Sequence, residues 1–397
     1  MTDITAFDFK AHDFIQNPYP YYQQLRDAPI HYREDWQFWL ISRYADVNAL
    51  LRDKRLGREP LPSTIQSPPA RYQPFYEMQA NSLMEREPPV HTRLKSLVHK
   101  AFTPRTVQQL KQRIHDMSHT LLDKAGNQFD VLEAFAVPLS VTVIAELLGV
   151  PESERHPLRG WSHDIVQMYE IGGQSSDVVA MRSVQAVEEF SDYLRDLIAR
   201  KRAHPQEDLL TALVQAEEQG NKLSEAELIA TCILILNAGH EATVNVLGNG
   251  LYALLKHPES MRKLRQHSDL LPTVIEEMMR YDTPLPMFRR WLYDDVELHS
   301  ITMKKGQEVA LFLASANHDP AEFEHPEQFN ITRQHNPHLS FGMGIHYCLG
   351  APLARLELQI ALHALLDRTE SIHLTEDVAY HDTFVFRGLQ SLPIYCD

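Results

Sequence analysis

Cysteine is scarce in this sequence. The 397 residues include three cysteines, Cys232, Cys348 and Cys396, which lie far apart and share no CxxC spacing. An odd number of widely spaced cysteines fits neither a disulfide framework nor a structural zinc site. At least one of the thiols is therefore expected to be free.

Positive charge is also in short supply. There are 38 Lys and Arg residues against 53 Asp and Glu residues, which gives a formal net charge of −15. A nucleic-acid-binding protein needs a basic surface, so the charge argues against nucleic acid as a partner. Residues 1–20 contain neither a basic start followed by an apolar run nor a long hydrophobic anchor. We therefore expect a cytoplasmic protein with no membrane partner.

Segments with helical periodicity dominate, whereas runs typical of β-strands are few and short. Helices are predicted at residues 20–26, 44–53, 106–126, 137–148, 183–202 and 209–219. Strands are predicted at residues 38–41, 296–298, 308–312 and 383–386, and the proline-rich residues 60–76 are expected to form one long loop. Without repeats or a clear linker, residues 1–397 are expected to form a single, mainly α domain with small β-sheets (α+β).

The best-marked helix is predicted at residues 224–256. Ser224 followed by Glu227 forms a capping box at its start, and Pro258 follows its end. Its apolar run, residues 228–236, is too short to span a membrane. We therefore expect a central helix that passes through a large core.

A glycine-rich loop places one cysteine before a predicted helix at residues 351–367. Residues 341–350 read Phe-Gly-Met-Gly-Ile-His-Tyr-Cys-Leu-Gly. The start of a helix favours a thiolate through its amide groups and dipole, although a cysteine buried only for packing is the plainer alternative. Glycines let the backbone lie close beneath a flat cofactor, and His346 would reach an anionic edge of that cofactor.

This loop resembles the haem loop of the cytochrome P-450 family, F-G-x-G-x-H-x-C-x-G. The matching residues are Phe341, Gly342, Gly344, His346, Cys348 and Gly350. The resemblance spans essentially the whole chain and implies the cytochrome P-450 fold, with haem b between the long central helix and the cysteine loop. It also implies that Cys348 is the axial ligand, whose thiolate pushes electron density toward the iron and favours O–O cleavage.

Further segments resemble other motifs of the family. Glu277 and Arg280 match E-x-x-R, which implies a structural ion pair behind the haem pocket. Gln328 stands where an arginine often completes this network. The third partner of the ion pair is therefore open.

Haem carries two propionates, which need cationic or hydrogen-bonding partners. His91 and Lys95 stand four residues apart, on one helical face, in a segment that resembles the family's propionate-binding region. Lys95 replaces the usual arginine and loses its bidentate fork. Arg290 stands where the family has an arginine on a strand. The resemblance implies that Arg290 and His346 are also partners of the propionates.

Residues 238–243, Ala-Gly-His-Glu-Ala-Thr, resemble the family's oxygen-binding motif A-G-x-[DE]-T. Glu241 and Thr243 are the catalytic candidates, because O–O scission consumes protons that a buried site must deliver. Ala242, however, occupies the threonine position, and Thr243 is rotated from it by about 100° around the helix. A substrate hydroxyl, an ordered water or a helix bulge would compensate.

The implied activity is the insertion of one oxygen atom from O2 into an apolar organic substrate. The implied electron donors are a separate ferredoxin-type protein and its reductase, with Lys100, Arg105 and Arg355 as candidate docking residues. One alternative is a peroxide-using or non-hydroxylating haem-thiolate enzyme, which the alanine at 242 would suit. Another is a non-catalytic haem- or ligand-binding protein.

A nicotinamide-binding motif is the remaining possibility that the sequence raises. Residues 248–253 fit G-x-G-x-x-A. This stretch lies inside a predicted helix, whereas a dinucleotide fingerprint follows a strand. A nicotinamide dehydrogenase is therefore excluded.

Overall fold

The computed structural model describes residues 7–28, 30–64, 68–169, 177–218 and 221–397. The chain divides into two compact units. Unit 1 contains residues 1–64, 115–137 and 242–397, and unit 2 contains residues 65–114 and 138–241. Residues 65–67 of the predicted loop and residue 219 of a predicted helix lie outside the described residues.

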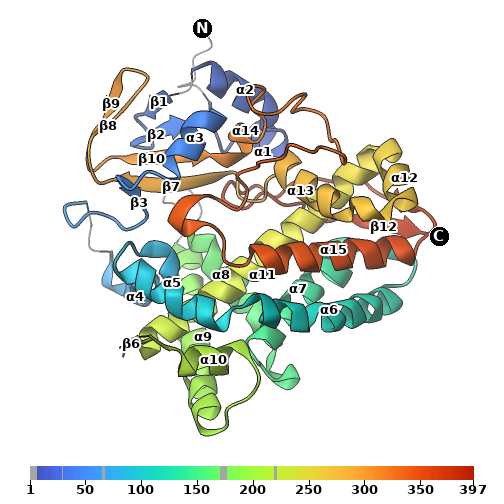
Figure 1. Cartoon of the computed structure of the whole chain (residues 1–397), viewed down its shortest axis with the longest axis horizontal. Helices are drawn as coiled ribbons and strands as arrows, with labels where there is room; N and C mark the ends of the chain where they lie inside the picture. The colour runs from blue at the N-terminus through green and yellow to red at the C-terminus, as the bar shows by residue number, and fades with distance from the viewer. Residues whose placement is uncertain (1–6, 29, 65–67, 170–176, 219–220) are drawn as a thin grey trace. The chain divides into compact units, whose positions relative to one another are not determined.

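The largest sheet of unit 1 has five strands in the order β1-β2-β10-β7-β3 (Figure 1). The strands are β1 (Ile30–Arg33), β2 (Phe38–Ile41), β3 (Leu56–Gly57), β7 (Met287–Leu292) and β10 (Glu308–Phe312). β10 is parallel to β2 and antiparallel to β7. Its apolar side chains are buried on both faces, as expected for a central strand. The predicted strands 38–41 and 308–312 are confirmed.

Helices and smaller sheets complete unit 1. Apart from two 3₁₀ turns, its remaining elements are α1 (His12–Gln16), α2 (Tyr19–Asp27), α3 (Tyr44–Leu50), β4 (Gln128–Asp130), a π-helical turn (Leu132–Ala136), α12 (Pro258–Gln266), α13 (Leu271–Tyr281), β8 (Val296–Leu298), β9 (Ile301–Met303), α14 (Leu313–Ala316), α15 (Ala351–Asp367), β11 (Ile372–Leu374) and β12 (Pro393–Cys396). Val47 and Leu50 of α3 share a buried cluster with Val309 and Leu311 of β10. The core of unit 1 therefore lies against this sheet.

Unit 2 is almost entirely helical. Its elements are α4 (Gln73–Ala80), α5 (Val90–Ala101), α7 (Val137–Leu147), α8 (Leu158–Val166), α9 (Asp177–Ala203), α10 (Leu209–Gln215) and the short strands β5 (Glu217–Glu218) and β6 (Asn221–Lys222). α6 (Pro104–Ala125) and α11 (Glu225–Lys256) each continue from one unit into the other along the chain. The helices α4 and α8 both pack against α9.

Three local predictions are wrong in whole or in part. The helix predicted at residues 209–219 ends at Gln215, and Glu217–Glu218 form the strand β5. Within the expected loop 60–76, a 3₁₀ turn precedes α4, which has a proline in its first turn. Proline reads as a loop residue, but its fixed φ also suits the start of a helix. The expected strand 383–386 is a bend, in which the Thr383 hydroxyl donates to the carbonyl oxygen of Phe386 at 2.8 Å. The Phe384 ring packs against Phe9 and Phe14 instead of extending a strand.

The long helix α11 begins and ends as predicted. The Ser224 hydroxyl accepts from the Glu227 amide at 3.2 Å, and the Glu227 carboxylate accepts from the Ser224 amide at 2.8 Å. Within unit 2, a Cβ atom at Gly239 would stand 2.5 Å from Cδ1 of Ile144 on α7. This close packing explains a glycine that would otherwise weaken the helix.

Among the described residues, α11 is the one helix long and apolar enough to cross a membrane. In its most apolar 18-residue window, 61% is buried inside the protein. A helix in the core of a protein passes the same test of length and composition. The burial of α11 therefore agrees with the expected role as a core helix.

A buried network of charges joins α13 to the segment that follows α14. Glu277 and Arg280 are both fully buried, and Arg280 donates to both carboxylate oxygens of Glu277 at 2.8 Å. The third partner is Arg333, whose Nε lies 3.1 Å from Glu277. Gln328 contributes only its backbone carbonyl, which accepts from Arg280 at 3.1 Å. The predicted pair is therefore confirmed, and its partner comes from five residues beyond the expected position.

We expect Glu277→Gln to lower the free energy of unfolding by about 3–5 kcal/mol, because it leaves two buried guanidinium groups without their anion. Glu259→Gln is the matched control, since Glu259 also precedes its arginine, Arg262, by three residues but is exposed. That change should cost about 0.2–1 kcal/mol. Urea denaturation of both variants measures the difference, and equal losses would contradict this account.

Candidate functional site

The predicted cysteine loop is a closed turn that leads directly into a helix. The amide of Cys348 donates to the carbonyl oxygen of Phe341 at 3.1 Å and closes the loop. Gly342 and Gly344 have φ angles of 66° and 71°, a left-handed conformation that side chains disfavour. α15 follows, with Gly350 as its N-cap. The glycine spacing therefore shapes the loop itself.

The loop also approaches a distant part of the backbone too closely for a side chain. A Cβ atom at Gly344 would stand 2.6 Å from the carbonyl oxygen of Leu51, inside the contact distance of nonbonded atoms. The neighbouring Met343 packs against the buried cluster that contains Leu51. The N-terminal side of the loop is therefore anchored in the core of unit 1.

Cys348 differs from the other two cysteines in its surroundings. Burial raises the pKa of the Cys232 thiol to about 12 and also raises the pKa of the Cys396 thiol, because desolvation disfavours the thiolate. Cys348 is only partly buried and precedes the N-terminus of the 17-residue helix α15. The helix dipole there favours an anion. The predicted ligand is thus the thiol whose surroundings suit a thiolate.

An ion pair ties α15 to α13 beside the loop. Arg355 donates to the two carboxylate oxygens of Glu276 at 2.6 and 2.8 Å, and His338 Nε2 lies 3.0 Å from the same carboxylate. The Arg355 guanidinium lies 4.5 Å from the centroid of the Phe341 ring, at the start of the loop. Arg355 was expected to dock a redox partner, but its charge is paired within unit 1.

Sequence reasoning missed Glu276 and His338. Burial by itself raises the pKa of Glu276, but hydrogen bonds from Arg355 and His338 outweigh it and bring the pKa down to about 2. The signal in the sequence is that Glu276 directly precedes Glu277. Adjacent residues of a helix point to different sides of it, so Glu276 has its own set of partners.

Two of the expected propionate partners belong to unit 1, as Cys348 does. Arg290 lies on β7 opposite Val309 and is 4% exposed. Its guanidinium donates to the carbonyl oxygen of Arg289 at 2.8 Å. His346 ends a 3₁₀ turn within the cysteine loop and is partly exposed. A buried guanidinium and an imidazole are donors of the kind that suits the carboxylates of haem.

The other two, His91 and Lys95, lie in unit 2. Both are on α5, one turn apart, so the expected shared helical face is confirmed. His91 is 2% exposed, and Lys95 is half-buried. Arg93, between them, pairs with Glu227 at the start of α11.

The oxygen-binding motif lies on α11, which is α-helical throughout its length. A helix bulge at residues 238–243, expected as one way to re-aim Thr243, is therefore absent. Thr243 is buried, and the regular geometry rotates it from the position of Ala242 by about 100°. The backbone therefore does not move the Thr243 hydroxyl to the position where the motif usually has its threonine.

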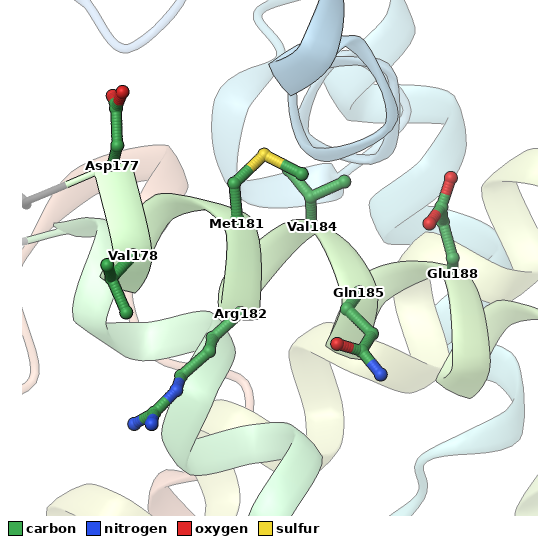
Figure 2. A pocket seen from close by; sticks show the side chains of 7 residues that line it. All are labelled: Asp177, Val178, Met181, Arg182, Val184, Gln185 and Glu188. Atoms are coloured by element: carbon green, nitrogen blue, oxygen red, sulfur yellow. The ribbon is translucent and has the colours of Figure 1, made fainter.

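A hollow on the surface of unit 2 contains none of the predicted site residues. It is lined by Asp177, Val178, Met181, Arg182, Val184, Gln185 and Glu188. Figure 2 shows that all these side chains project from α9, with Met181 and Val184 on one side and Val178 and Arg182 on the other.

A family model described as Cytochrome P450 matches residues 38–377. The chain is 38% identical over 389 residues to the biotin biosynthesis cytochrome P450 of Bacillus subtilis (strain 168), covering 96% of this chain and 97% of that protein. It is 39% identical over 397 residues to the polyketide biosynthesis cytochrome P450 PksS of the same organism, covering 96% of each.

Solved structures give the same result. P450BioI, in complex with an acyl carrier protein ligated to hexadec-9Z-enoic acid, matches with a TM-score of 0.92 and 36% identity, covering 97% of this chain and 99% of that one. The PksS structure of Bacillus subtilis 168 matches with a TM-score of 0.90 and 38% identity, covering 98% and 100%. The expected fold class is confirmed.

We expect the free energy of unfolding of Glu276→Gln to fall less than that of the wild type when the pH is lowered. The folded-state pKa of about 2 lies below the ordinary value of about 4.3. The carboxylate therefore stabilises the fold above about pH 4, and this contribution is lost as the pH falls toward 2. Urea denaturation across this window should show a smaller loss in the variant. Exposed Glu297→Gln should follow the wild type, and identical behaviour of both variants would contradict the prediction.

Proposed function

This chain belongs to the cytochrome P450 family and is a haem-thiolate monooxygenase, and we propose that it oxygenates an apolar organic substrate with electrons from a separate redox partner. The observation that carries the proposal is the cysteine loop. It holds a partly buried thiol before the N-terminus of α15, on a backbone anchored in the core of unit 1.

Haem b with a cysteine thiolate as axial ligand is the cofactor of this family. When bound, the haem supplies the redox chemistry of oxygen activation. We assign Cys348 as its ligand, and Arg290 and His346 of unit 1 as partners of the propionates. His91 and Lys95 of α5 are assigned to the same task. Each assignment rests on the type, burial and position of the side chain.

On α11, Glu241 is proposed to hold a proton for the reaction, and Thr243 to contribute its hydroxyl. The alanine at 242 removes the alcohol that ordinarily accompanies the acid. A substrate hydroxyl or an ordered water would then complete the path of protons. The same alanine favours a second function, in which the enzyme uses peroxide or does not hydroxylate its substrate.

For the substrate we propose an acyl or polyketide chain. Two similar proteins are named for biotin and polyketide biosynthesis, and one similar structure holds a fatty acid on an acyl carrier protein. A long apolar chain would gain affinity mainly by burial of its methylene groups, at about 0.8 kcal/mol each. A ferredoxin-type protein and its reductase are proposed as the electron donors, with exposed Lys100 and Arg105 as docking cations.

We expect the reduced holoprotein to show a strongly red-shifted Soret band with carbon monoxide, because a thiolate donates electron density through the iron. Cys348→Ser should abolish this shift. Cys396→Ser is the matched control, since this cysteine is buried in β12 and should leave the spectrum unchanged. An ordinary haem spectrum in the wild type would displace Cys348 as ligand.

We expect Ala242→Thr to increase the fraction of electrons that ends in product by roughly a few-fold, because it restores a hydroxyl beside the acid. The ratio of product formed to reductant consumed measures this fraction, and isotopically labelled O2 identifies the source of the inserted oxygen. If the fraction of electrons that ends in product stays the same or falls, the missing alcohol does not limit the reaction. Product without labelled oxygen would favour the peroxide-using or non-hydroxylating alternative.

A further inference from the structure

The Arg355 side chain lies on two residues of the cysteine loop. Its guanidinium is 4.5 Å from the centroid of the Phe341 ring, and its Nη1 atom lies 3.4 Å from the hydroxyl of Tyr347. The carbonyl oxygen of Phe341 accepts from the Cys348 amide at 3.1 Å, and Tyr347 directly precedes Cys348. All four residues belong to unit 1. A positive charge therefore contacts the loop at both ends of the segment that leads to the proposed haem ligand.

One carboxylate compensates this charge. Glu276 on α13 accepts from Nε and Nη2 of Arg355 at 2.6 and 2.8 Å, a two-point contact for which the planar guanidinium is suited. Burial raises the pKa of Glu276, but hydrogen bonds from Arg355 and His338 outweigh it and bring the pKa to about 2. Glu276 is therefore ionised at neutral pH, and the pair carries no net charge.

The third member of this group, His338, adds no charge to it. Its Nδ1 atom accepts from the backbone amide of Ser340 at 3.3 Å, so this nitrogen carries no hydrogen. Nε2 must then carry the hydrogen of the ring, and it lies 3.0 Å from the Glu276 carboxylate, which accepts. An imidazole with hydrogen on one nitrogen is neutral. His338 thus holds Glu276 in place without changing the balance of charge.

We infer that the Arg355–Glu276 pair sets the reduction potential of the haem, an inference that rests on the proposed assignment of Cys348 as its ligand. A cation near the haem favours the addition of an electron, and an anion disfavours it. Arg355 contacts the loop itself, whereas Glu276 contacts Arg355, and the two effects oppose each other. Both side chains are positioning residues, because they act on the haem through the loop.

The step that the pair influences is a transfer of one electron. In the proposed function the redox partner is oxidised by one electron as the haem iron is reduced by one electron, and no proton or leaving group moves. Arg355 follows Cys348 by seven residues, which is roughly 10 Å at 1.5 Å per helical residue. At that distance, one uncompensated charge in partly buried surroundings changes the reduction equilibrium on the order of tenfold. Tenfold corresponds to about 59 mV for one electron.

Potentiometric titration of the holoprotein measures this equilibrium without any turnover. Arg355→Met leaves the carboxylate uncompensated and should lower the equilibrium constant for reduction by about 3–10-fold. Glu276→Gln leaves the guanidinium uncompensated and should raise the constant by a similar factor. The double variant should return toward the wild type, because both charges are gone. Shifts of the two single variants in the same direction, or a double variant further from the wild type than either, would overturn the inference.

Two control variants separate charge from packing. His338→Gln removes a buried, neutral contact with the same carboxylate, so it should leave the potential unchanged. Arg262→Met removes one partner of the exposed Arg262–Glu259 pair on α12 and should also leave it unchanged. A shift in either control as large as that of Arg355→Met would assign the effect to packing or to the net charge of the protein, and would reject the inference.

The conservative variant Arg355→Lys keeps the charge but loses the two-point contact. Its potential should stay closer to the wild type than that of Arg355→Met, and an equal shift would contradict the inference. If Arg355→Met does not retain haem, Glu276→Gln decides by itself, since an unchanged or lower potential overturns the inference. A wild type without the red-shifted carbon monoxide band would reject Cys348 as the ligand. That band together with unmoved potentials would reject this inference alone.

Discussion

Much of unit 1 depends on one buried carboxylate. Glu277 receives hydrogen bonds from Arg280 and Arg333 and from the amide of Asn330, with no exposed side-chain surface. A buried charge that loses its partners costs several kcal/mol. The helix α13 and residues 324–336 therefore cannot separate without a large penalty. The adjacent Glu276 transmits this rigidity to α15 through Arg355, and so to the loop that carries Cys348.

The cysteine loop shows how a reactive thiol is kept in place. Its glycines adopt conformations that other residues avoid, and one of them lies against the backbone at Leu51. The thiol therefore meets a helix N-terminus at a position that the core defines. The two other cysteines are in buried surroundings that raise the pKa of the thiol and disfavour a thiolate. The position of Cys348 in the loop avoids this burial.

The middle of α11 is held by contacts within unit 2, around the ring of His240. The contact with the Leu236 carbonyl orients the ring, and close packing at Gly239 holds the helix.

Local patterns in the amino-acid sequence determined much of this protein. The Ser224 capping box, the helical periods, the glycine spacing around Cys348 and the i,i+3 pair of Glu277 and Arg280 are properties of short segments, so the sequence specifies them directly. The tertiary structure decided which distant side chains meet. Arg333 rather than Gln328 completes the buried network, Arg355 turns to Glu276, and Ser162 reaches His240. No spacing rule predicts these contacts, because they depend on how helices pack after residues far apart in the chain have come together.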